Sequence, residues 1–239
     1  MRWHLVDGRP VRSLVTGSPS PAGPSSGVPE LVVVPGLGAL GYLLPFVRAC
    51  AGWTRVHLLD LPGFGARTTS RLPAGLTPVG AALGAWLEQV PDAPVVLLGH
   101  STGAQLALLA ARARPERVSR LVLAGATFPP QARRALPLLR RVLTTLPHER
   151  LAELPAVLPY YGRGRGRLLE LLRSGLADAP STDGLAAPVV LRGAHDGLCP
   201  PAWAAHLAAG GPVVELPGGH NALFVVPEQA SAAVRAAVG

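Results

Sequence analysis

The chain of 239 residues is long enough for one domain of mixed helices and strands with an insertion. Its formal net charge of +8 comes from 22 arginines and no lysine. These arginines are scattered and few aromatic residues lie among them, which argues against a nucleic-acid-binding protein. Two cysteines, Cys50 and Cys199, are too few for a disulfide framework and do not form a metal-binding cluster.

The sequence predicts neither a secretory signal nor a membrane span. The first ten residues contain no apolar core of the kind that a signal peptide needs. The uncharged stretch 31–47 is broken by prolines and glycines, and the stretch 93–111 by a polar turn. We therefore expect a cytoplasmic protein.

Strands and helices are expected to alternate along most of the chain. Residues 3–6 and 11–15 predict an antiparallel hairpin at a sheet edge. After a Ser/Pro/Gly-rich loop at 17–29, apolar strands are expected at 31–34, 56–59, 95–98, 121–123, 189–191 and 213–216. Helices are expected from about Tyr42, at 77–90, 104–113 and 202–209, and from Pro227. This alternation predicts a mostly parallel sheet covered by helices on both faces.

One connection is too long for an ordinary loop. Residues 128–182 contain amphipathic, arginine-rich segments at 131–143 and 165–176, which favour a helical insertion. The connection leaves the sheet at the carboxyl ends of its strands, where ligands of such sheets bind. We therefore expect a core made of residues 1–127 and 183–239, and a cap made of residues 128–182. The arginines at 163, 165 and 167 are expected on the solvated surface of that cap.

The most informative stretch is Val95–Gly103, in which an apolar strand ends in G-H-S-T-G. Gly99, Ser101 and Gly103 form a G-x-S-x-G pattern between a predicted strand and a predicted helix. A tight turn at this point strains the serine backbone and leaves room only for small flanking residues. The serine hydroxyl would then stand beside a helix N-terminus that can stabilise an oxyanion.

With several other stretches, this motif makes the whole chain resemble the α/β-hydrolase family. P-G-L-G after the first parallel strand resembles the family's oxyanion loop, and D-L-P-G-F-G at 60–65 resembles the turn after the next strand. Asp196 in G-A-H-D-G and His220 in P-G-G-H-N each follow a predicted strand, in the family's order of nucleophile, acid and histidine. The resemblance implies an α/β-hydrolase fold with a small helical cap and a catalytic triad of Ser101, Asp196 and His220.

The chemistry explains why these residue types belong together. A serine hydroxyl is a poor nucleophile unless a histidine removes its proton, and a buried carboxylate must orient that histidine. The backbone N–H groups of Thr102 and Leu37 are expected to hold the oxyanion. The family often has a histidine where this chain has Pro35, so the support of the oxyanion loop is expected to differ. No metal or organic cofactor is required.

Other polar residues near these motifs are expected to have structural roles. His100 and His195 should serve packing and loop hydrogen bonds, and Asp60 should brace its turn. Phe128, Tyr160 and Tyr161 are candidates for lining a substrate pocket, although they could equally pack the cap against the core.

The resemblance implies a serine hydrolase that cleaves a carboxylic ester or thioester of a small hydrophobic substrate through an acyl-enzyme. A serine nucleophile argues against the branches of the family that carry an aspartate at this position. The same triad also supports carbon–carbon bond hydrolysis, lactone chemistry and cofactor-free perhydrolysis in similar proteins. Some relatives with an intact triad act as small-molecule receptors or signalling proteins, and a structural module on this fold is a third alternative. The expected partner is a small molecule, and no motif indicates the oligomeric state.

Overall fold

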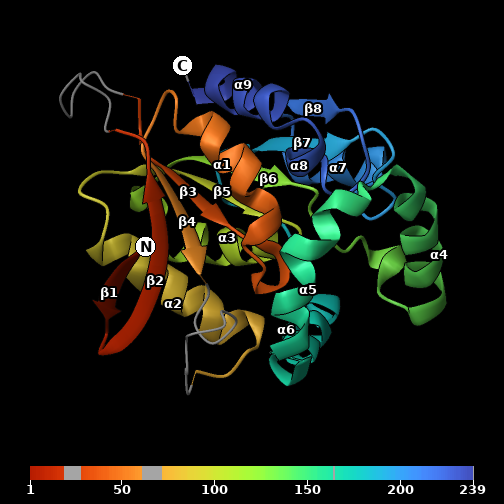
Figure 1. Cartoon of the computed structure of the whole chain (residues 1–239), viewed down its shortest axis with the longest axis horizontal. Coiled ribbons are helices and arrows are strands. Elements are labelled where there is room, and N and C mark those ends of the chain that lie inside the picture. The colour runs from red at the N-terminus through yellow and green to blue at the C-terminus, as the bar shows by residue number, and fades with distance from the viewer. Residues whose placement is uncertain (19–27, 61–71, 164, 239) are drawn as a thin grey trace.

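The computed structural model describes residues 1–18, 28–60, 72–163 and 165–238, with the side chains of residues 9, 159–163 and 165 left undescribed. In this part of the chain, eight strands form one sheet in the order β1-β2-β4-β3-β5-β6-β7-β8 (Figure 1). The strands are β1 (Arg2–Val6), β2 (Arg9–Thr16), β3 (Leu31–Val34), β4 (Val56–Asp60), β5 (Val95–His100), β6 (Val118–Ala124), β7 (Val189–Gly193) and β8 (Val213–Leu216). β1 and β2 form an antiparallel hairpin, and β2 also pairs antiparallel with β4. The remaining neighbours in the sheet, from β4 through β3, β5, β6 and β7 to β8, all pair in parallel.

Helices cover both faces of the sheet because successive side chains of its buried strands point to opposite faces. In β3, Val32 and Val34 belong to the core that also contains buried residues of α2 (Leu76–Gln89), α3 (Thr102–Ala113) and α7 (Pro201–Ala208). Leu31 and Val33 of the same strand pack on the other side, in the core that contains α1 (Leu44–Cys50), α8 (Ala222–Val225) and α9 (Pro227–Val238). The predicted sheet with two covered faces is confirmed.

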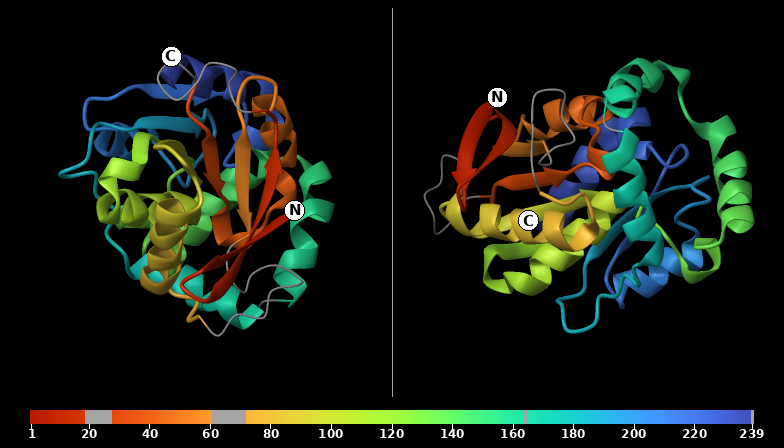
Figure 2. Two further views of the ribbon diagram at one scale, coloured as in Figure 1. Left: turned by 90° about the vertical axis from the view of Figure 1, so that its left-hand side faces the viewer. Right: turned by 90° about the horizontal axis from the view of Figure 1, so that it is seen from below.

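The long connection between β6 and β7 is helical. It contains α4 (Ala135–Thr145), α5 (Leu154–Arg163) and α6 (Arg165–Ala177), with short 3-10 turns at Leu146–His148 and Leu151–Glu153. Figure 2 shows α4, in green, at the outer edge of the molecule, while α5 and α6 lie closer to the sheet. We call residues 130–177 the inserted segment.

Most expected elements are found close to their predicted positions, and the differences have local causes. The strand expected at 121–123 begins earlier, at Val118. Its first residues were not predicted because the exposed Ser119 and Arg120 interrupt the apolar pattern. The sequence did not predict α5, in which Pro155 and Pro159 obscure the helical pattern. The predicted turn at 61–65 and most of the predicted loop at 17–29 lie outside the described residues. None of the described helices is both long and apolar enough to cross a membrane.

Candidate active site

Ser101 lies on the sharp turn between β5 and α3. Its backbone has φ 58° and ψ −127°, and its N–H donates a hydrogen bond to the carbonyl oxygen of Ala124 at 2.9 Å. A Cβ atom on Gly99 would lie 2.3 Å from the carbonyl oxygen of Gly103, and a Cβ on Gly103 would lie 2.3 Å from that of Val34. Side chains therefore cannot be accommodated on either side of the serine, which gives the G-x-S-x-G pattern its structural reason.

The structure brings Ser101, His220 and Asp196 together from three separate loops. His220 Nε2 lies 3.0 Å from Ser101 Oγ, and His220 Nδ1 lies 3.0 Å from Asp196 Oδ2. The second carboxylate oxygen, Asp196 Oδ1, accepts hydrogen bonds from the N–H groups of Leu198 and Cys199 at 2.9 and 3.1 Å. Because the carboxylate can only accept, Nδ1 carries the proton and Nε2 is left to accept the serine proton.

The electrostatics of the three residues suit this arrangement. Burial alone would raise the pKa of Asp196, but the charge and hydrogen bond of His220 and two backbone N–H groups outweigh it and hold that pKa below its usual value. For His220, burial favours the neutral ring, yet the nearby carboxylates of Asp196, Glu149 and Glu153 raise its pKa above 6.5. The site therefore stabilises an imidazolium on His220.

A second hydrogen-bonded chain supports the loop after β3. The Gly36 N–H donates to Tyr42 Oη at 2.9 Å, Tyr42 Oη lies 2.7 Å from His100 Nδ1, and His100 Nε2 lies 3.1 Å from the carbonyl oxygen of His220. Since a carbonyl only accepts, Nε2 is the donor and Tyr42 donates to Nδ1 of a neutral ring. Burial, and then the charge of His220, lower the pKa of His100 to about 3, which is consistent with that neutral state.

This chain supports the loop that follows Pro35. His100 makes loop hydrogen bonds as expected from the sequence, whereas the part played by Tyr42 was missed. Tyr42 and His100 are 58 positions apart in the sequence, and no motif indicates that they interact.

The two expected oxyanion donors are adjacent, but one of them is engaged. The Leu37 N–H donates a 2.8 Å hydrogen bond to the side-chain Oγ1 of Thr102. Leu37 has a left-handed backbone, with φ 47° and ψ 26°, which is uncommon for a residue other than glycine. Thr102 is the first residue of α3, and the first N–H groups of a helix have no acceptor within the helix.

A cavity of about 350 Å³ lies next to the serine, between the core and the inserted segment. Among the predicted lining residues, Phe128 borders it, whereas the side chains of Tyr160 and Tyr161 lie outside the described residues. The same is true of the side chains of Arg163 and Arg165, while Arg167 is partly buried. The apolar lining comes from both sides of the cavity: Leu37, Phe128, Leu138, Val142, Val157, Leu172 and Leu198.

The inserted segment also contacts the loop that carries Asp196. The Gly197 N–H donates to Thr145 Oγ1 at 3.0 Å, and Arg141 donates to the Gly197 carbonyl oxygen at 2.8 Å. The ring of His148 stacks on that of His195 with 3.9 Å between the ring centres. His195 thus has the packing role that the sequence predicted.

Glu149 connects the inserted segment to the loop that carries His220. Its Oε1 accepts hydrogen bonds from the backbone N–H groups of His220 and Asn221, the latter at 3.2 Å. Burial raises the pKa of Glu149, while the charge of His220 and the two N–H groups lower it. The role of Glu149 was not predicted, because no motif distinguishes it from the other glutamates of the sequence.

Asp60 ends β4, which is separated by β3 from β5, the strand that leads to the serine. It is fully buried and forms an ion pair with Arg12 of β2, whose Nε lies 2.6 Å from Asp60 Oδ2. The structure thus gives Asp60 a bracing role, but between two strands. The turn that it was expected to brace lies outside the described residues.

Comparison with known proteins shows what the chain is similar to. The sequence model of a family described as "Alpha/beta hydrolase family" matches residues 31–237. The "Magnesium-chelatase 30 kDa subunit" of Rhodobacter capsulatus is 31% identical over 153 residues, which are 63% of this chain and 52% of that protein. The chain therefore spans about half the length of this curated relative.

Solved structures share the fold at lower sequence identity. A thermophilic esterase from Thermogutta terrifontis is 20% identical with a TM-score of 0.72, and the match covers 99% of this chain and 97% of that one. The enol-lactonase from Burkholderia xenovorans LB400 is 19% identical with a TM-score of 0.68, over 98% of both chains. At these identities the likeness concerns the fold.

Proposed function

The chain belongs to the alpha/beta hydrolase family, and on that premise we propose that it is a serine hydrolase that cleaves a carboxylic ester or thioester of a small hydrophobic compound. The observation that carries the proposal is the hydrogen-bonded chain Ser101–His220–Asp196 at one side of a largely apolar cavity. Residues 128–182 act as a cap over the substrate.

The first half of the reaction forms an acyl-enzyme. Ser101 Oγ attacks the substrate carbonyl carbon as His220 Nε2 takes the hydroxyl proton, and Asp196 stabilises the resulting imidazolium. The oxyanion accepts hydrogen bonds from the N–H groups of Thr102 and Leu37. When the tetrahedral intermediate collapses, His220 gives its proton to the departing alkoxide or thiolate, and the acyl group stays on Ser101.

The second half releases the acid. A water molecule donates a proton to His220 Nε2 and attacks the acyl carbonyl carbon through the same oxyanion site. Collapse of this second intermediate breaks the bond to Ser101 Oγ, which takes the proton back from His220. The products are one carboxylic acid and one alcohol or thiol, and the enzyme returns to its initial state.

The proposal can be tested by intact-mass analysis after exposure to a fluorophosphonate. We expect one equivalent of label on the wild-type protein, no label on Ser101→Ala, and labelling slowed by at least about 1,000-fold on His220→Ala, since the triad works as a unit. A panel of esters, thioesters and lactones would then define the substrate class. Failure of a correctly folded wild-type protein to react would contradict the proposal and favour a ligand-binding protein on the same fold.

A further inference from the structure

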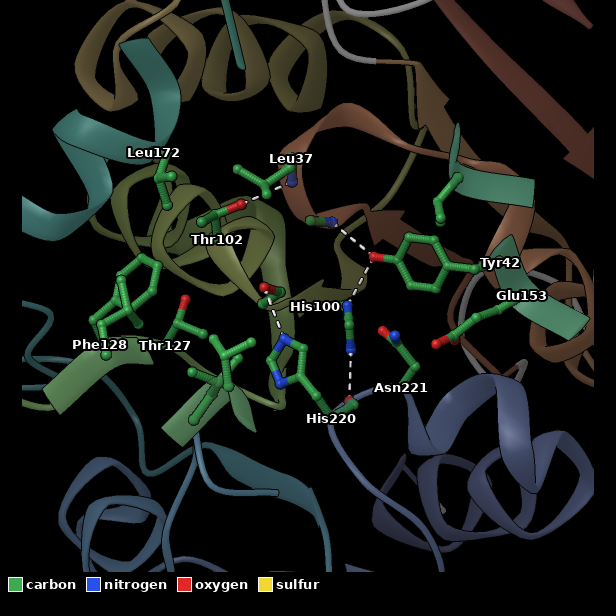
Figure 3. A pocket seen from close by; sticks show the side chains of 16 residues that line it. Leu37, Tyr42, His100, Thr102, Thr127, Phe128, Glu153, Leu172, His220 and Asn221 are labelled. Atoms are coloured by element: carbon green, nitrogen blue, oxygen red, sulfur yellow. Dashed lines mark hydrogen bonds between the residues drawn. The ribbon is translucent and has the colours of Figure 1, made fainter. Parts of the chain in front are cut away.

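The cavity beside Ser101 has one polar end that the proposed reaction does not use. Apart from the catalytic centre its described lining is mostly apolar, and Glu153 is the acidic side chain among these lining residues. Glu153 ends the short 3-10 turn Leu151–Glu153 of the inserted segment and is only 6% exposed. Figure 3 shows its carboxyl group directed toward the side chain of Asn221, the residue that follows His220.

One oxygen of this carboxyl group has no partner. Glu153 Oε2 is buried and accepts no hydrogen bond from any of the described residues. Buried polar atoms are nearly always hydrogen-bonded, and a carboxyl group that is removed from water without a partner is costly. The uncompensated oxygen is covered in this structure, and a turn of the carboxyl group of Glu153, which lines the cavity, would present it to a donor of another molecule.

The surroundings of Glu153 define the chemistry of that donor. The ionisable groups that face it are Glu149 of the same inserted segment and His220 of the loop after β8, together with the amide of Asn221. Burial, the charge of Glu149 and a side-chain hydrogen bond with Glu149 raise the pKa of Glu153 to about 7, while hydrogen bonding from Asn221 and the charge of His220 act against them. A donor group would compensate this acidic pair, and a ligand carboxylate would be repelled by it.

We propose that Glu153, together with Asn221, is a recognition site for a hydrogen-bond donor of the substrate, either a hydroxyl or an ammonium group. This inference rests on the proposed hydrolase function and narrows its substrate to an ester with an apolar body and a polar, donor-bearing end. An analogue that ends in a methyl group would fill the same space and leave Glu153 Oε2 unpaired, so the enzyme would discriminate against it.

Matched esters test the inference. Two series of p-nitrophenyl or simple alkyl esters, one varied in the acyl part and one in the alcohol part, would end in a methyl, hydroxyl, ammonium or carboxylate group. The measured quantity is the ratio of kcat/KM for each polar ester to that for its methyl-terminated analogue. For the wild-type protein we expect this ratio to be about 10 or more for the ester with a donor group in one of the two series, which corresponds to the free energy of one hydrogen bond to a charged group. For the ester that ends in a carboxylate we expect a ratio below one.

Variants assign the preference to Glu153. Glu153→Leu should bring the donor ratio to about one, and Glu153→Gln, which keeps the shape and an acceptor oxygen, should lower the ratio several-fold and affect the ammonium ester most. Glu228→Gln, which removes an exposed carboxylate from the first turn of α9, is the control and should keep the wild-type ratio. If Glu153→Leu does not fold, the Gln variant decides the question alone.

The outcomes separate this inference from the proposed function. Equal turnover of donor and methyl esters by the wild type, or a preference that survives in both Glu153 variants, would overturn the role of Glu153 while fluorophosphonate labelling of Ser101 still supports a hydrolase. Absence of both labelling and ester turnover in the folded wild type would overturn the hydrolase and, with it, this inference.

Discussion

At the scale of single residues, Thr102 serves two opposed purposes. Its backbone N–H is a proposed oxyanion donor, but its side-chain hydroxyl accepts the hydrogen bond of the second proposed donor, the Leu37 N–H. A forming oxyanion must therefore replace the hydroxyl as the acceptor of that amide. The sequence could identify both residues from their motifs, but their mutual hydrogen bond depends on the threonine rotamer and could not be predicted.

Replacement of this hydroxyl should accelerate the reaction. In Thr102→Ala the Leu37 N–H is free before substrate arrives, and we expect kcat to rise by roughly 2- to 10-fold, the value of one neutral hydrogen bond. Steady-state kinetics with a p-nitrophenyl ester would measure it. Thr102→Ser keeps a hydroxyl and should change kcat less, whereas a fall in kcat for the alanine variant would show that the hydroxyl itself helps to hold the oxyanion.

At the scale of elements, the hairpin of β1 and β2 is attached to the parallel sheet by one buried ion pair as well as by its backbone hydrogen bonds. Arg12 on β2 and Asp60 at the end of β4 face each other in the register of the two strands. Asp60 is fully buried and the Arg12 side chain is 11% exposed. Burial raises the pKa of Asp60, which the pairing with Arg12 opposes.

Breaking this pair from one side should be costly. Arg12→Met leaves a buried carboxyl group without its partner, and we expect the free energy of unfolding to fall by about 3 kcal/mol. The double variant Arg12→Met/Asp60→Leu should recover most of this loss. Urea denaturation would measure both, with Arg55→Met as the control. Arg55 pairs with Glu30 at a partly exposed site, so its loss should cost no more than about 1 kcal/mol. Equal losses in the two single variants would contradict the assignment.

At the scale of the whole molecule, the inserted segment contacts both loops that carry the proposed acid and the proposed base. Thr145 and Arg141 hold the loop of Asp196 through Gly197, and Glu149 accepts the N–H groups of His220 and Asn221. The acid and the histidine are therefore both positioned from outside the core. Glu149 also adds negative charge near His220 and so contributes to its raised pKa.

The charge of Glu149 should appear in the pH profile. In the proposed reaction His220 must be neutral to accept the proton of Ser101, so wild-type kcat/KM should fall as the pH drops through a pKa that is raised above 6.5. Glu149→Gln removes one of the groups that raise this pKa, and its acidic limb should move to lower pH. Glu149→Ala also removes the acceptor of two N–H groups and should lower kcat by roughly 10-fold or more. An acidic limb that does not move in the glutamine variant would show that Glu149 does not act through charge.

Features that depend on local sequence patterns could be predicted, whereas features that depend on contacts between distant segments could not. The alternation of apolar strands with helical segments was enough to predict the sheet and its two helical layers, because a strand that is buried on both faces has a continuous apolar sequence. G-x-S-x-G, the polar residues after later strands and the family resemblance predicted that Ser101, Asp196 and His220 lie together, and the structure places Ser101 and Asp196 each within hydrogen-bond distance of His220. Tyr42, Glu149 and Glu153 were missed because their roles depend on contacts between segments that are distant in the sequence, such as Glu149 and His220, which are 71 positions apart.

The anchoring of the Asp196 and His220 loops by the inserted segment restricts how this protein can acquire new substrates. An insertion exchanged as a module with a relative would take away Arg141, Thr145 and Glu149, and the acid and the base would lose their outer supports together. Divergence by substitution of side chains that face the cavity, such as Leu138 or Val142, leaves those supports in place. Adaptation of this protein, in nature or by directed evolution, should therefore proceed by changing the residues of the inserted segment that line the cavity rather than by replacing the segment.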